Sequence, residues 1–182
     1  LIPQAMSIVA DEVIDLHRQL VPYGYDEINV NLGCPSGTVV SKKRGSGILA
    51  YPDMLDSFLD ELYTKADFPV SIKTRVGFND DELWPKLIEI YSKYPISELT
   101  VHPRVQKDFY KNTPRMDDFA LAMQKINPDK TILCYNGDIT DTNSFNALTD
   151  RFPDIDEIMI GRGLFANPAL IAELKGISMD KA

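Results

Sequence analysis

The stretch N-V-N-L-G-C-P-S-G, residues 29–37, reads as the end of a β-strand followed by a tight turn. Polar and apolar residues alternate up to Leu32, which is typical of a strand, and the proline and glycines then end it. Cys34 stands on this turn. Pro35 restricts it to extended backbone geometry, while the flanking glycines allow a tight path. The sequence therefore predicts a thiol held at the carboxyl end of a strand.

The same arrangement recurs along the chain as an apolar or β-branched run, a turn and a segment of helical period. Strands are predicted near 2–4, 27–31, 70–75, 98–102, 131–135 and 157–160. Helices are predicted near 11–20, 53–65, 82–93, 117–126 and 142–150, with another beginning at Pro168. Repeated βα units predict an α/β fold with a parallel sheet, and no linker divides residues 1–182, so one domain is expected.

Polar side chains stand at the carboxyl ends of three of these strands, in pairs two residues apart. The pairs are Asn29 with Asn31, Lys73 with Arg75, and His102 with Arg104. Residues two apart on a strand point to the same side, so each pair is expected to project together. A (β/α)8 TIM barrel builds its active site at this face. A doubly wound sheet is the alternative, but no glycine-rich fingerprint follows the first strand, which favours the barrel.

Two late turns carry glycines, in Y-N-G-D-I at 135–139 and I-G-R-G-L-F at 160–165. Glycine lets backbone amides approach an anion closely, and the positive N-terminal end of a following helix also attracts an anion. Arg162 supplies a guanidinium group that can bind an anion through two N–H groups. Adjacent late loops of a barrel commonly bind phosphate. Each turn alone is more often a plain connection, but the two together predict a phosphate site.

Composition and charge restrict the class of protein. The chain has 182 residues with 44% hydrophobic and 25% charged content, as in ordinary globular domains. No run approaches the roughly 20 apolar residues of a membrane span and no secretory signal precedes the first strand, so we expect a cytoplasmic protein without membrane association. The formal net charge of −8 argues against bulk attraction to nucleic acid.

Local basic patches oppose this charge. Lys42, Lys43 and Arg44 form one, and a looser second one contains Arg104, Lys107, Lys111 and Arg115. The cysteines, Cys34 and Cys134, have neither disulfide nor zinc spacing, and no metal site is expected.

Several single residues have both a functional and a plain interpretation. Lys73 and His102 can donate hydrogen bonds to an anionic or carbonyl-rich ring, or be satisfied locally. Cys134, inside T-I-L-C-Y, is predicted to be a small buried core residue. His17 is predicted to lie on the surface and Trp84 to pack in the interior.

Five motifs occur in one order: N-V-N-L-G-C-P, S-I-K-T-R-V-G-F, L-T-V-H-P-R, Y-N-G-D-I and M-I-G-R-G-L-F-A-N-P. This succession closely resembles the tRNA-dihydrouridine synthases, flavin-dependent oxidoreductases that reduce the C5=C6 bond of selected uridines in tRNA. The resemblance extends from Gln4 to Leu170. It implies a barrel that carries FMN at its carboxyl face and uses NADPH as reductant, although the choice between NADPH and NADH is left open.

The resemblance also implies roles for matching residues. Flavin contacts are expected from Gln4, Lys73 and His102, and contacts around its phosphate end from Asn136, Gly137, Asp138, Gly161 and Arg162. Cys34 would be the catalytic acid. Asn31 would help to position the uracil, Arg75 would lie in the same cluster, and Lys42, Lys43 and Arg44 would contact tRNA phosphates.

The chemistry agrees with a cysteine on a stiff turn. Reduction of uracil adds hydride at carbon 6 and a proton at carbon 5, and an ordinary thiol is mostly protonated at neutral pH. A correctly placed acid contributes roughly 10²- to 10⁴-fold to the rate. Residues 37–47, which include Gly45 and Gly47, are predicted to form a lid that orders over substrate.

The sequence departs from the family at several points. The family's barrel has eight strands, and its first two units and its carboxyl-terminal helical domain have no counterpart here, so the chain is expected to be a piece with two open edges. Pro103 replaces a more usual glycine, and S-K-K-R at 41–44 replaces a glycine-rich loop. Two other hypotheses remain open: an FMN barrel that reduces a small enone or pyrimidine, and a structural fragment without a ligand. The oligomeric state is not predicted.

Overall fold

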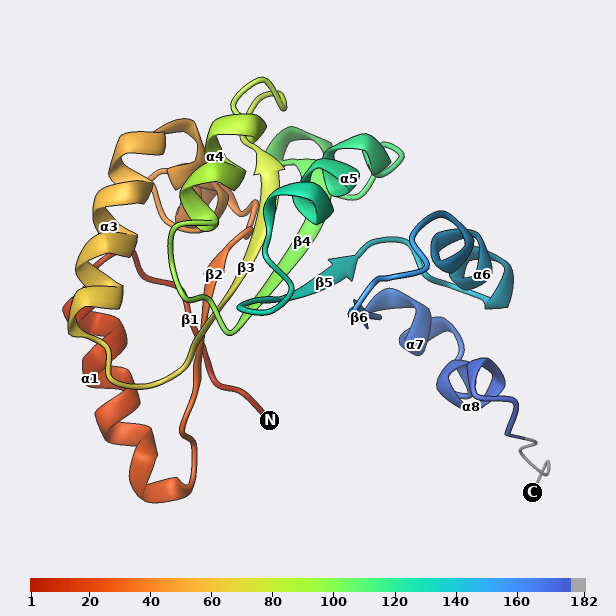
Figure 1. Cartoon of the computed structure of the whole chain (residues 1–182), viewed down its shortest axis with the longest axis horizontal. Coiled ribbons are helices and arrows are strands. Elements are labelled where there is room, and N and C mark those ends of the chain that lie inside the picture. The colour runs from red at the N-terminus through yellow and green to blue at the C-terminus, as the bar shows by residue number, and fades with distance from the viewer. Residues whose placement is uncertain (178–182) are drawn as a thin grey trace.

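Six parallel strands lie side by side in a single sheet (Figure 1). The computed structural model describes residues 1–177. The strands are β1 Gln4–Ala5, β2 Ile28–Leu32, β3 Val70–Gly77, β4 Glu98–Val105, β5 Ile132–Asn136 and β6 Glu157–Met159. All six predicted strands are present. Strand β1 lies about two residues later than predicted because only Gln4 and Ala5 pair with β2.

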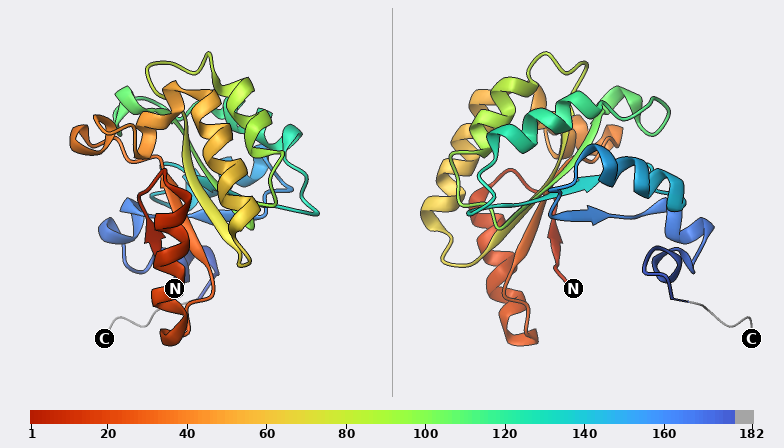
Figure 2. Two further views of the ribbon diagram at one scale, coloured as in Figure 1. Left: turned by 90° about the vertical axis from the view of Figure 1, so that its left-hand side faces the viewer. Right: turned by 45° about the vertical axis from the view of Figure 1, so that its right-hand side comes forward.

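The order of the strands identifies the fold. Each strand pairs in parallel with the next one in the sequence, from β1 through to β6. A doubly wound sheet would reverse its order at a switch point, so that alternative is excluded. Figure 2 shows the sheet curving, with helices along its convex side. The fold is an incomplete (β/α) barrel whose open edges are β1 and β6.

Helices connect the strands. They are α1 Ala10–Leu20, α2 Gly37–Val40, α3 Pro52–Lys65, α4 Trp84–Tyr91, α5 Met116–Lys125, α6 Thr142–Arg151, α7 Arg162–Ala166 and α8 Leu170–Leu174, with 3-10 turns η1 Val21–Tyr23, η2 Gly45–Ala50 and η3 Gln106–Asp108. The five predicted helices between the strands are confirmed, and the boundaries of each agree with the prediction to within about two residues. The short α2 and α7 were not predicted because four or five residues carry too little periodicity.

The hydrophobic core lies between the convex face of the sheet and α1, α3, α4 and α5. Every second residue of β2 points into it, so Ile28, Val30 and Leu32 are fully buried. Trp84 packs in this core as predicted, and its Nε1 donates to the Asp118 carbonyl oxygen at 2.8 Å. No helix within residues 1–177 is long and apolar enough to cross a membrane.

The concave face of the sheet is polar. Side chains that alternate with the core residues form an amide ladder across β1, β2 and β3. Gln4 donates to Asn29 at 2.7 Å, Asn29 donates to Ser71 at 3.0 Å, and Asn31 donates to Gln4 at 2.8 Å. Because strands of a barrel share this inner face, their polar ends converge at one rim.

Candidate functional site

A cavity of about 500 Å³ lies at the carboxyl ends of the strands. It is lined by Gln4, Asn31, Gly33, Cys34, Pro35, Lys73, Arg75, His102, Tyr110, Asn136, Gly137, Asp138, Met159, Ile160, Gly161 and Arg162. The structure thus brings together the predicted flavin, uracil and catalytic residues from all six strand ends. Tyr110, Met159 and Ile160 were not predicted as lining residues.

The turn that carries Cys34 is fixed from both sides. The Asn31 side-chain oxygen accepts from the backbone amides of Gly33 at 3.0 Å and Cys34 at 2.9 Å. The Cys34 carbonyl oxygen accepts from the Ser46 amide at 3.0 Å and its hydroxyl at 2.9 Å. Cys34 itself is half-buried and lines the cavity.

Two further side chains hold the same turn. Arg75 donates through Nε to the Gly33 carbonyl at 2.9 Å, and Gln106 donates to the Pro35 carbonyl at 3.0 Å. The turn is therefore stiff because four neighbouring segments bind its main chain.

The segment that follows this turn is only partly exposed. Residues 45–49, within η2, are buried, and a Cβ at Gly45 would lie 2.7 Å from the Cys34 carbonyl oxygen. The lid predicted over residues 37–47 is therefore restricted by packing at its carboxyl end.

Arg75 joins the loops after β2 and β4. It is 2% exposed, and besides Gly33 it donates to the carbonyls of Val105 at 3.1 Å and Phe109 at 3.0 Å. Phe109 has a φ of 50°, which costs a non-glycine residue energy and persists here under this tether. The guanidinium groups of Arg75 and Arg162 both lie over the ring of the next residue, Tyr110, at 5.6 and 4.7 Å from its centroid.

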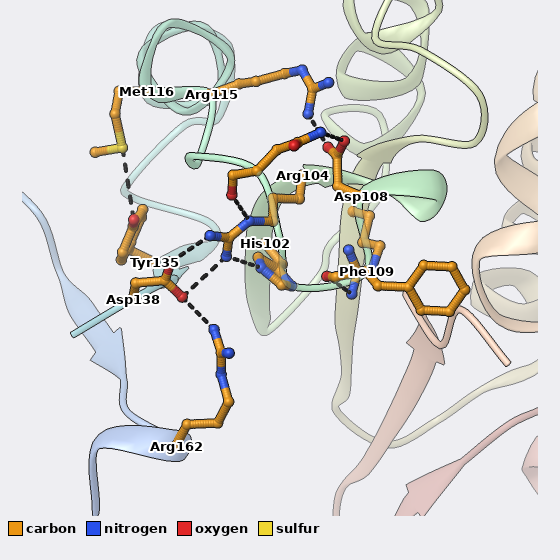
Figure 3. A network of polar contacts seen from close by, with 11 residues as sticks. His102, Arg104, Asp108, Phe109, Arg115, Met116, Tyr135, Asp138 and Arg162 are labelled. Carbon is orange, nitrogen blue, oxygen red and sulfur yellow. Dashed lines mark hydrogen bonds and ion pairs between the residues drawn. The ribbon is translucent and has the colours of Figure 1, made fainter. Parts of the chain in front are cut away.

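A polar network connects β4 with the late loops (Figure 3). Arg104 donates to both carboxylate oxygens of Asp138 and to His102 Nε2, the last at 3.2 Å. Arg162 donates to the same carboxylate. The prediction that His102 and Arg104 project together is confirmed, whereas the idea of Arg104 as part of a basic surface patch was wrong because this side chain is buried.

The electrostatics follow from this arrangement. Burial, reinforced by Arg75, lowers the pKa of Lys73 to about 8. Burial and the neighbouring cations likewise lower the pKa of His102 to about 3, so this imidazole is neutral at physiological pH. Hydrogen bonds from Arg104 hold the pKa of Asp138 below its usual range. The cavity wall thus carries cations, a neutral imidazole and one carboxylate.

Close packing requires glycine at one position in this wall. A Cβ at Gly137 would collide with the Tyr135 hydroxyl at 2.0 Å, whereas a Cβ at Gly161 would meet open space. Gly161 therefore presents its backbone to the cavity without a covering side chain, as anion-binding turns do.

The predicted basic patch Lys42, Lys43 and Arg44 does not line the cavity. Lys42 is exposed, Lys43 lies 4.5 Å from the Tyr51 ring centroid, and Arg44 pairs with Glu12 at 3.0 Å. In the looser second patch, Arg115 pairs with Asp108 and Asp81, while Lys107 and Lys111 are exposed.

One group of metal-ligand type lies apart from the cavity, on the concave face. Within residues 1–177 it is the only such group, and it comprises Glu98, Cys134 and Glu157, whose ligand atoms lie within 4.8 Å of one another. Glu98 already accepts a hydrogen bond from Thr100 at 2.6 Å. Cys134 is 2% exposed, as predicted for a core residue.

Comparisons with known proteins agree with the motifs. A family model described as Dihydrouridine synthase (Dus) matches residues 6–181. A probable tRNA-dihydrouridine synthase of Staphylococcus aureus (strain N315) is 34% identical over 154 residues, which cover 82% of this chain and 46% of that protein. The tRNA-dihydrouridine synthase B of Pasteurella multocida (strain Pm70) is 29% identical over 168 residues, covering 92% and 49%. The chain spans about half the length of these curated relatives.

Proposed function

Because the chain belongs to the dihydrouridine synthase family, we propose that it forms the FMN-binding, catalytic part of a tRNA-dihydrouridine synthase that uses NADPH as reductant. The observation that carries the proposal is the cavity at the strand ends, where the residues expected to contact the flavin ring, the flavin phosphate and the uracil meet. The reaction class is an oxidoreductase acting on a CH–CH bond.

The cavity wall fits an anionic, acceptor-rich ring with a phosphate. Lys73, Arg75 and Arg162 supply positive charge, and His102 supplies a neutral polar group. Gln4 would bind the ring from the β1 edge. The residues proposed for the phosphate end are Asn136, Gly137, Asp138, Gly161 and Arg162. When bound, reduced FMN supplies the hydride that uracil receives at carbon 6.

Cys34 is proposed to give the proton to carbon 5 of the uracil. An acid acts efficiently only when it is fixed against the reacting atom. The main chain of this turn is held by Asn31, Ser46, Arg75 and Gln106, which fixes the backbone from which the Cys34 side chain reaches the cavity. Asn31 also orients the amide of Gln4. The second N–H of the Asn31 side-chain amide is proposed to help position the uracil.

The proposed substrate is a uridine extruded from tRNA, at a cost of a few kcal/mol. Lys42 and Lys43 are exposed on the segment directly after the Cys34 turn, and they are proposed to bind backbone phosphates together with Arg44. Arg44 must exchange its Glu12 partner for phosphate, so its contribution should be the smallest of the three.

The test uses absorption and activity of the purified chain. After FMN has been added and unbound FMN removed, the protein is expected to keep a flavin absorption spectrum. It is also expected to form dihydrouridine in undermodified tRNA when NADPH is supplied. Cys34→Ala should slow turnover by about 10²- to 10⁴-fold and leave flavin binding intact. Cys134→Ala removes the other thiol and serves as the matched control.

Three outcomes would contradict parts of the proposal. Failure to bind FMN would favour a structural fragment, and equal turnover of free uridine would favour a small-molecule reductase. An unslowed Cys34→Ala would reject the acid role.

A further inference from the structure

Arg104 is a buried cation two residues after His102 on β4. It is 1% exposed, and each of its three guanidinium nitrogens donates to a protein acceptor: the carbonyl of Asn112, His102 Nε2 and both oxygens of Asp138 (Figure 3). The Asp138 carboxylate compensates the buried charge, which would otherwise be costly. Arg104 does not line the cavity, so it acts on the site only through its partners.

The contact between Arg104 and His102 determines where the imidazole carries its proton. A guanidinium group can only donate, so Nε2 of His102 must accept and the proton must lie on Nδ1. Within residues 1–177 Nδ1 has no hydrogen-bond partner. The one fully buried side-chain atom without a partner in that range is Asp118 Oδ2, so Nδ1 remains accessible. His102 lines the cavity, which is where an accessible Nδ1–H would meet an acceptor.

Burial first, and then the surrounding cations, lower the pKa of this imidazole and keep it neutral. Lys73 and Arg75 face it from β3 and Arg104 from its own strand, while Asp138 is the carboxylate that opposes them from the β5–α6 loop. Asp138 is already bound by Arg104 and Arg162. A second proton on His102 would therefore place a fourth cation in a buried cluster.

We propose that Arg104 is a positioning residue, which holds His102 as an uncharged Nδ1–H donor toward an acceptor atom of the ring bound in the cavity. The other tautomer would present a lone pair and repel a carbonyl oxygen or an unprotonated ring nitrogen. The identity of the ring rests on the proposed function, whereas the proton position on His102 does not.

Nitrogen-15 NMR of histidine-labelled protein tests the proton position directly, because the chain has only two histidines, His17 and His102. Two-bond nitrogen–proton correlations should show His102 with a protonated Nδ1 and a bare Nε2, unchanged between pH 8 and pH 5. A proton on Nε2, or titration of His102 within this range, would overturn the proposal without any variant.

Three variants test the role of the guanidinium. Arg104→Met should mix the tautomers of His102, and Arg104→Lys, which keeps a donor, should retain Nδ1–H. Arg115→Met is the matched control, because Arg115 pairs with Asp108 and Asp81 and does not touch His102. A pure Nδ1–H tautomer in Arg104→Met would overturn the proposal.

Titration with FMN, followed by flavin fluorescence, tests the role of Arg104 in ligand binding separately from the proton position on His102. Loss of one hydrogen bond from His102 should weaken binding about tenfold in Arg104→Met and leave Arg115→Met unchanged. Equal affinity of Arg104→Met and wild type would overturn the role of Arg104 in ligand binding. Failure of the wild type itself to bind FMN would refute the proposed function, and the NMR result would still decide the state of His102.

Discussion

Replacing Arg75 by methionine should loosen the rim of the cavity and destabilise the fold. The change removes hydrogen bonds to three carbonyls, those of Gly33, Val105 and Phe109. Gly33 and Val105 are buried, and an unpartnered buried acceptor costs roughly 1–3 kcal/mol. Phe109 is exposed, so its carbonyl can bind water instead.

The opposing effect is the removal of a buried charge. Within residues 1–177 Arg75 forms no ion pair, so methionine relieves a desolvation cost that burial imposes on the guanidinium. The two lost carbonyl contacts set the range at about 2–6 kcal/mol, and this relief places the expected loss of unfolding free energy near its lower end, about 3 kcal/mol. Typical domains have about 5–15 kcal/mol in total, so the loss is large.

Urea unfolding measures the loss, and the reaction of Cys34 with a thiol reagent measures the loosening. Arg75→Met should speed modification of Cys34, while Cys134, which is 2% exposed, stays protected. Arg18→Met is the control, because the Arg18 side chain is 72% exposed and, within residues 1–177, pairs only with Asp15. A loss for Arg75→Met no greater than for this control, with unchanged Cys34 reactivity, would refute the reasoning.

Three further changes have defined outcomes in urea unfolding. From pH 7 to pH 5 the wild type should lose about 2 kcal/mol more than His102→Gln, because the unfolded chain binds a proton at this imidazole below about pH 6.5 and the folded chain only near pH 3. Equal pH dependence would contradict this. Gly45→Ala should cost about 1–3 kcal/mol, since its φ of 54° and the Cys34 carbonyl both exclude a side chain; a neutral result would refute it. Burial and Asp81 raise the pKa of Asp118 to about 7, so the folded chain binds more protons than the unfolded chain below that pH and loses stability as pH rises through it. Asp118→Asn should therefore stabilise at pH 8 more than at pH 5, and the reverse order would be inconsistent.

The strands could be predicted from the sequence because each has one polar and one apolar face. Polar and apolar residues therefore alternate along it. The run from Glu27 to Leu32 carries both faces in six residues, and the register of β2 against β3 then places Asn31 beside Lys73. Helix positions followed from the periodicity of the segments between strands. Short elements such as α2 and η2 could not be predicted, because their stability comes from packing against the Cys34 turn rather than from local pattern.

The site was predicted only as far as its motifs extended. Tyr110 lies in a loop without periodicity, and its place depends on the unusual backbone of Phe109. Arg104 was interpreted as surface charge because its partner, Asp138, is 34 positions away. The spacing of His102 and Arg104 on one strand was the available signal, and it indicated a shared direction without revealing the partner.

The restraints on the Cys34 turn all attach to main-chain atoms, on the amides of residues 33 and 34 and the carbonyls of 33, 34 and 35. The backbone conformation of this turn therefore does not depend on the side chain at position 34. Serine, selenocysteine or a chemically labelled sulfur can be installed there with the backbone unmoved, so reactivity at this point can be varied as a single parameter.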